Sequence, residues 1–125
     1  HVFEMFKVHQ GATYLPSELE GPQYELSGQS LPAIVASTSK DGSGHIHLSL
    51  CNLDPGTSIE LTCDIQGAQV GSASARVLTA GTINAFNTFE APDAVKPVPL
   101  DNVRVSEGKV MAPLPAKSVV VITIK

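Results

Sequence analysis

The chain has 125 residues, which fits one domain, and 42% of them are hydrophobic while 16% are charged. This balance excludes an intrinsically disordered chain, and no apolar run approaches the length of a membrane-spanning helix. The net charge is −4, and the eight Lys and Arg residues are scattered. The sequence therefore lacks both the basic stripe that binds nucleic acid and the polybasic cluster that binds a membrane surface.

The first eleven residues predict a short helix. The side chains that recur at helical spacing are Val2, Met5, Phe6 and His9. Gly11 stands where a glycine commonly ends a helix. Phe3 falls outside the main apolar face, so we expect this helix to need partners on more than one side.

After Gly11, short β-rich runs alternate with turn signals, which is typical of an all-β sandwich or barrel. The clearest hairpin joins 33–39 to 45–53 through a loop rich in Gly and Asp. Apolar and polar residues alternate along 45–53 and 58–65, but Val119–Ile122 leaves no polar face. The last strand is therefore predicted to be either a central strand covered on both sides or a strand that faces another domain. The expected strands are 13–15, 23–26, 32–39, 45–53, 58–65, 73–79, 103–106, 109–114 and 118–125, with a long ordered loop over 84–100.

His45 and His47 share one face of a predicted strand, with Cys51 further along the same face. Two histidines at this spacing can bind a metal, but no third ligand is specified, and solvent-facing strand residues explain the pattern equally well. We assign no metal and no cofactor. Cys63 lies on the apolar face of its strand and Cys51 on a polar face, so we expect two free thiols rather than a disulfide.

Neither catalysis nor sugar binding has a strong signal. A glycosidase needs two carboxyl groups that face each other across a sugar. Glu90 and Asp93, in the long loop, are the only acidic pair in an unusual context, and we assign them to fixing the loop rather than to catalysis. No Gly-x-Ser-x-Gly elbow or Gly-rich phosphate loop occurs. With no Trp, only Tyr14 and Tyr24 remain as platforms for stacking a sugar, and we interpret both as core-edge residues.

Several stretches of the chain resemble one known family. The segment HVFEMFKVHQGATYLP at the start resembles the region that leaves the barrel in α-L-arabinofuranosidases of glycoside hydrolase family fifty-one. LPAIVAS at 31–37 and CNLDP at 51–55 are similar to the C-terminal domain of that family. The more specific blocks are NTFEAPDAVKP at 87–97 and LPAKSVVV at 114–121. The resemblance runs along essentially the whole chain.

The resemblance implies a parent enzyme with a catalytic (β/α)₈ barrel followed by a jelly-roll β-sandwich. Such an enzyme removes terminal α-L-arabinofuranosyl groups from arabinan or arabinoxylan with retention of configuration. Its two barrel glutamates, the acid/base and the nucleophile, would lie before His1, so Glu4 and Glu90 do not replace them. Residues 1–11 would be the tail of the last barrel helix, and residues 12–125 the C-terminal sandwich. Relatives often carry His at the position of Phe86, so no role that needs an imidazole there carries over.

We therefore predict an all-β, jelly-roll-like antiparallel β-sandwich, with a short N-terminal helix left from a preceding catalytic barrel. Its predicted role is that of a non-catalytic accessory domain that packs on and stabilises the barrel of the same parent chain; contacts in a homo-oligomer are a further hypothesis. The alternatives are an autonomous carbohydrate-binding module and a generic interaction β-sandwich. The compartment, cytoplasmic or secreted, stays open. The predicted docking residues are apolar and lie in segments without core-like alternation: Val2, Phe3, Met5, Phe6, Phe86, Phe89 and Val95.

Overall fold

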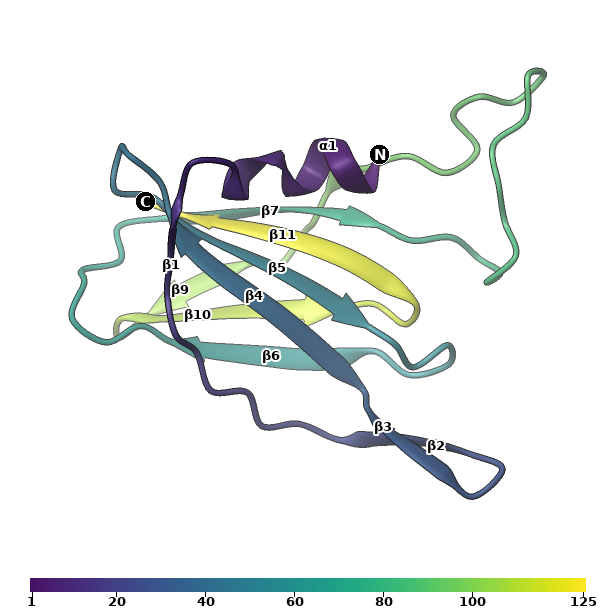
Figure 1. Ribbon diagram of the computed structural model, residues 1–125, viewed down its shortest axis with the longest axis horizontal. Helices are drawn as coiled ribbons and strands as arrows, with labels where there is room; N and C mark the ends of the chain where they lie inside the picture. The colour runs from purple at the N-terminus through teal and green to yellow at the C-terminus, as the bar shows by residue number, and fades with distance from the viewer.

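The computed structural model describes residues 1–125 as two packed antiparallel sheets with a short helix on the outside (Figure 1). This confirms the predicted antiparallel β-sandwich with an N-terminal helix. No helix is both long and apolar enough to cross a bilayer. The elements are α1 (Val2–Phe6), the 3₁₀ helix η1 (Lys7–His9), β1 (Thr13–Tyr14), β2 (Gln23–Leu26), β3 (Gln29–Pro32), β4 (Ile34–Lys40), β5 (Ile46–Asn52), β6 (Ile59–Asp64), β7 (Ala73–Leu78), β8 (Val98–Pro99), β9 (Arg104–Ser106), β10 (Lys109–Leu114) and β11 (Ser118–Ile124).

The two sheets differ in size. The large sheet has six strands in the order β1-β4-β5-β11-β7-β8, and the small sheet has three in the order β6-β10-β9. The hairpin of β2 and β3 pairs with neither sheet and projects from one end of the domain (Figure 1). Every paired strand is antiparallel to its neighbour.

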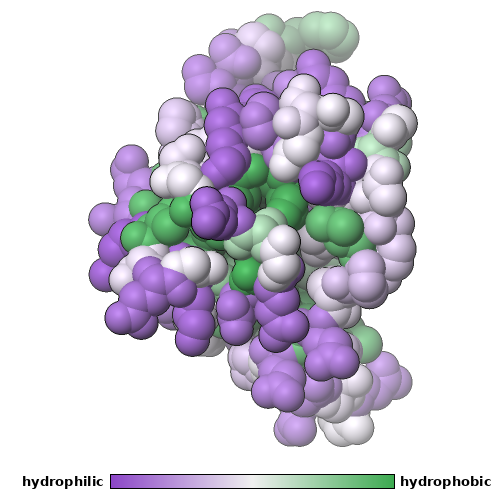
Figure 2. All heavy atoms as spheres, turned by 90° about the vertical axis from the view of Figure 1, so that its left-hand side faces the viewer, coloured by the Kyte–Doolittle hydropathy of each residue, from purple (hydrophilic) through white to green (hydrophobic).

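The hydrophobic core lies between the two sheets. Leu50 and Ile122 of the large sheet and Leu114 of the small sheet are each at most 1% exposed. β11 pairs with β5 on one side and with β7 on the other, which confirms the predicted central position of the last strand. Figure 2 looks onto the end of the sandwich where the C-terminus lies, and it shows apolar side chains at the centre within a polar rim. Partly buried apolar side chains that pack against the core are therefore visible from this end.

Two strands escaped the sequence analysis, Gln29–Pro32 and Val98–Pro99. Each is short, exposed and ends in a proline, which weakens a strand signal. The first of them pairs with β2 across Ser27 and Gly28, whose φ angles of 52° and 79° are typical of the two-residue turns that match strand twist.

Asn52, at the end of β5, joins the two sheets through its side chain. It is 2% exposed, and its Nδ2 donates to the main-chain oxygens of Thr57, Leu114 and Pro115 at 3.0, 3.2 and 3.0 Å. Its Oδ1 accepts a hydrogen bond from the main-chain N–H of Asp54 at 3.1 Å. One amide thus fixes the β5–β6 connection against the turn between β10 and β11.

We predict that Asn52→Ala lowers the free energy of unfolding by about 2 kcal/mol or more, because buried carbonyl groups lose their donor. Urea unfolding of the protein measures the change. Thr62→Ala, on the exposed face of the small sheet, is the control and should change the stability by less than about 0.5 kcal/mol. Equal stabilities of the two variants would contradict the assigned role of Asn52.

Candidate domain-docking surface

The N-terminal helical segment lies on the outer face of the large sheet (Figure 1). Met5 is 1% exposed, and Val121 on the outward side of β11 is 6% exposed. Nη1 of Arg76, on β7, donates to Oε1 of Glu4 at 3.1 Å, and this hydrogen bond lowers the pKa of the Glu4 carboxyl. Residues 2–9 are therefore packed on the sandwich, and their assignment to the last helix of a barrel stays a prediction.

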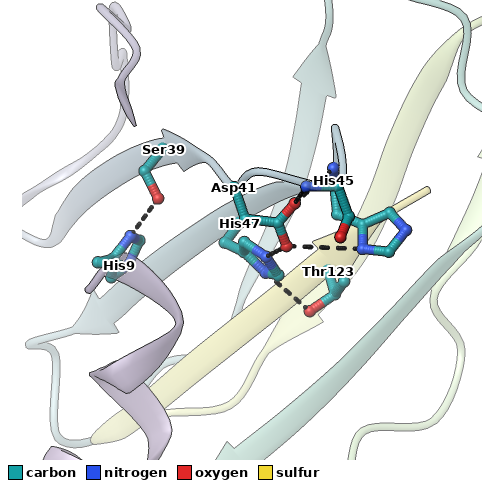
Figure 3. Close-up of polar contacts among 7 residues, drawn as sticks. His9, Ser39, Asp41, His45, His47 and Thr123 are labelled. Carbon is teal, nitrogen blue, oxygen red and sulfur yellow. Dashed lines mark hydrogen bonds and ion pairs between the residues drawn. The ribbon is translucent and has the colours of Figure 1, made fainter. Parts of the chain in front are cut away.

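A chain of polar contacts holds the end of this segment (Figure 3). The His9 imidazole is hydrogen-bonded to the hydroxyls of Ser39, on β4, at 2.6 Å, and of Ser49, on β5. The expectation that the polar face of β5 points to solvent is wrong for His47 and Ser49, which are 6% and 4% exposed. They are buried because the helical segment covers that part of the sheet.

His47, the cross-strand neighbour of Ser39, connects two further segments (Figure 3). Its Nε2 donates to Oδ2 of Asp41 at 2.8 Å, since a carboxylate can only accept. Its Nδ1 lies 3.1 Å from the Thr123 hydroxyl, on β11. The hydrogen bond from His47 lowers the pKa of Asp41 to about 2, and the main-chain N–H groups of His45 and Ser43 act in the same direction.

The arrangement of carboxylate, imidazole and hydroxyl has the order found in nucleophilic triads. Its contacts, however, all join parts of the domain itself: the β4–β5 loop, β5 and β11. His45 is 3.6 Å from the same Asp41 oxygen, and no group of three or more His, Cys, Asp or Glu side chains is arranged to hold a metal ion. We interpret the cluster as the anchor of the β4–β5 loop on β5 and β11.

The predicted docking residues fall into two groups. Phe3, Phe86 and Phe89 are 95%, 73% and 104% exposed, and Val2 is also exposed. Met5 is buried inside the domain and holds the helix on the sheet, while Phe6 and Val95 are half-buried. The N-terminal end of α1 and the loop between β7 and β8 lie on the same side of the sandwich (Figure 1).

The loop that carries Phe89 is closed by its own hydrogen bonds. Asn87 donates through Nδ2 to the oxygen of Val95 at 2.8 Å and accepts from the N–H of Val95 at 2.6 Å. The N–H of Ala91 donates to Oγ1 of Thr88, and the N–H of Thr88 donates to the oxygen of Ala91. This role of Asn87 and Thr88 was not predicted, because the only signal in the sequence is a pair of turn-forming polar residues before the aromatic ring.

The acidic pair does not fix this loop as expected. Asp93 makes only an exposed ion pair with Lys96 at 3.8 Å, and Glu90 is exposed. The structure assigns the loop-fixing role to Asn87 and Thr88 because their side chains reach main-chain groups across the loop.

The remaining candidates are distributed over separate elements. Tyr14 is 72% exposed rather than at the core edge, and Tyr24 is half-buried on the β2–β3 hairpin. The prediction of two free thiols is confirmed: Cys51 lies in the large sheet, and Cys63 lies in the small sheet against the core. Burial raises the pKa of both thiols, and the Asp64 carboxylate adds to the effect at Cys63.

Together, these observations define an antiparallel β-sandwich domain that carries exposed aromatic side chains on α1 and on the loop between β7 and β8. A sequence model of the family described as the alpha-L-arabinofuranosidase C-terminal domain matches residues 1–118. The chain belongs to this family. It is 36% identical over 126 residues to an intracellular exo-alpha-L-arabinofuranosidase of Bacteroides ovatus, which covers all of this chain and 24% of that protein.

Solved structures agree with this membership. The arabinofuranosidase of glycoside hydrolase family 51 from Xanthomonas axonopodis pv. citri matches with a TM-score of 0.96 and 35% identity, over 100% of this chain and 25% of that chain. A family 51 alpha-L-arabinofuranosidase from Bifidobacterium longum matches with a TM-score of 0.74 and 31% identity, over 85% of this chain and 21% of that chain. The chain thus spans about a quarter of the length of such relatives.

We predict that His9 makes the stability of the domain dependent on pH. Burial, and then the nearby His47, lower the pKa of His9 below 6.5 in the folded state. The unfolded chain therefore binds a proton at His9 more readily than the folded chain does. The free energy of unfolding should fall as the pH drops from 6.5 through the lower pKa that His9 has in the folded state. Above pH 6.5, His9 should contribute no pH dependence.

His9→Gln keeps a side chain that can donate and accept hydrogen bonds but removes the titration. Thermal unfolding between about pH 7.5 and pH 5 should show a smaller loss of stability in this variant than in the unchanged protein. Asp41 does not interfere because its pKa of about 2 lies far below this window. Identical pH profiles of the two proteins would count against the assignment.

Proposed function

We propose that this chain is a non-catalytic accessory domain of an α-L-arabinofuranosidase, and that it packs on and stabilises the catalytic barrel. The observation that carries the proposal is Phe89, a fully exposed aromatic ring on a loop that is closed by its own hydrogen bonds. A rigid loop that presents an aromatic side chain binds with little loss of conformational entropy. Phe86, in the same loop, and Phe3, on α1, are further exposed aromatic side chains.

The proposed parent activity is release of terminal α-L-arabinofuranosyl groups with retention, by two carboxyl groups on the barrel. Within this chain, the acidic side chains with definite partners serve structural contacts. Glu4 pairs with Arg76, Asp41 with His47, and Glu60 with Arg104. The catalytic barrel of the same polypeptide is the proposed partner, and contacts between copies of the enzyme are a second proposed use of the exposed surface.

A carbohydrate-binding role is the second candidate, and it rests on Tyr14. This ring is largely exposed on β1, at the edge of the large sheet, where it is free to stack on a sugar. Isothermal titration with arabinan or arabinoxylan tests this role. Binding that disappears in Tyr14→Ala would support a binding module over a docking domain.

Hydrolysis of a chromogenic α-L-arabinofuranoside is the first test of the parent activity. We expect the chain extended upstream in its gene to be active and the purified 125-residue chain to be inactive. Activity of the 125-residue chain alone would overturn the non-catalytic assignment and direct attention to Glu90 and Asp93. Inactivity of both proteins would remove the proposed activity and leave the sandwich fold in place.

We predict that Phe89→Ala in the extended protein lowers the stability of the docked state by about 2 kcal/mol, the typical cost of truncating an aromatic anchor. Differential scanning calorimetry should then show the sandwich unfolding at a lower temperature than in the unchanged protein. The matched control is Tyr14→Ala, which removes another exposed ring away from the proposed interface. If the two variants unfold alike, Phe89 is not an anchor.

A further inference from the structure

The outer face of the large sheet is divided into two halves of opposite character. The half near the end of the helical segment is polar. There, His9 is hydrogen-bonded to Ser39 and Ser49, and His47 is hydrogen-bonded to Thr123. The other half is apolar. Strand register places Val35 beside Cys51, Cys51 beside Val119, and Val119 beside Leu78, which makes one row across β4, β5, β11 and β7. We call these four residues the apolar row.

The apolar row is only partly covered by the domain itself. Val35 is 43% exposed, and Cys51, Val119 and Leu78 are half-buried. Leu53, which follows β5 and is hydrogen-bonded through its N–H to the oxygen of Ala33, adds another exposed apolar side chain at this end. The helix of the domain thus covers much of the polar half and leaves the apolar half open. Contiguous exposed apolar surface of this kind marks a site of association.

We propose that the apolar row is covered by the catalytic barrel of the same polypeptide, as a second contact beside the Phe89 loop. This inference rests on the proposed function. The family is a C-terminal domain, and the chain spans about a quarter of its relatives, so most of such a protein precedes this domain. In this proposal the barrel joins the domain at α1, which lies on the outer face of the large sheet (Figure 1). The strand register places the apolar row on that same face, next to the row of Val121.

Geometry and charge favour the same occupant. Neighbouring rows on one face of a sheet are about 7 Å apart, so the apolar row lies close to the row that contains Val121, which α1 already covers. The proposed interface therefore continues an existing contact between helix and sheet. The apolar row contains no charged side chain. Its partner should present an apolar, uncharged surface, as the outer helices of a barrel do when another domain packs on them.

Val35→Lys in the extended protein tests the proposal. Val35 is exposed enough within the domain to accept a lysine, whereas a lysine in an interdomain contact would be buried without a partner. Calorimetry should show one unfolding transition for the unchanged protein and two separate transitions for the variant. Thr62→Lys, on the outward face of the small sheet, is the matched control and should leave a single transition. Leu53→Lys repeats the test at a second position of the same surface.

The cysteines supply an independent measurement in the same proteins. Cys51 is the direct neighbour of Val35 in the strand register, whereas Cys63 faces the core from the other sheet. Val35→Lys should accelerate the labelling of Cys51 by a thiol reagent by about tenfold and leave the labelling of Cys63 unchanged. Acceleration at both thiols would indicate general unfolding of the sandwich and would overturn the proposal.

Other outcomes separate this inference from the proposed function. If Phe89→Ala uncouples the domains and Val35→Lys does not, the barrel docks elsewhere and the apolar row is not its contact. If neither change uncouples them, the proposed docking function fails as well. If Val35→Lys changes the sedimentation coefficient of the protein while unfolding stays coupled, the apolar row is a contact between copies of the enzyme, and the barrel is excluded as its occupant.

Discussion

The central strand β11 has apolar side chains on both faces, and the rest of the domain is arranged to cover them. Val120 and Ile122 face the core and are covered by the small sheet, while Val121 faces outward and is covered by α1. A strand of this kind is stable only where protein lies on both sides. This requirement explains why β11 occupies the middle of the large sheet and why a helix too short to be stable alone lies on the outer face.

The short helical segment is fixed by specific contacts at its two ends rather than by a broad apolar face. Met5 and the Glu4–Arg76 pair fix its first turns, and His9 fixes its end through two serine hydroxyls. Hydrogen bonds in a partly buried site are directional, so they set the position of the helix on the sheet more strictly than apolar contact does.

The predictable part of the structure was the part with a strong local pattern. Alternation along β5 and β6 gave correct strands, and the run Val119–Ile122 gave the central position of β11. The burial of His47 was not predictable, because alternation identifies two faces but does not say what covers the polar one. The hairpin that turns at Ser27 and Gly28 was not predicted because its strands lack apolar alternation. The hydrogen bonds of Asn87 and Asn52 were not predictable because the residues they join come together only in the complete fold. The resemblance carried by blocks such as 87–97 identified the family, which local patterns of alternation could not do.

The order of synthesis gives the placement of α1 a further significance. The ribosome makes α1 first and β11 last within this domain, yet β11 is the strand whose outer face α1 covers. Until β11 has been made, α1 has no complete sheet to pack on. The apolar faces of α1 and of the incomplete sheet then remain exposed to other chains. The domain therefore assembles only at the end of its synthesis. A nascent chain interrupted before β11 would have an unpacked helix and an incomplete sheet that is prone to aggregate.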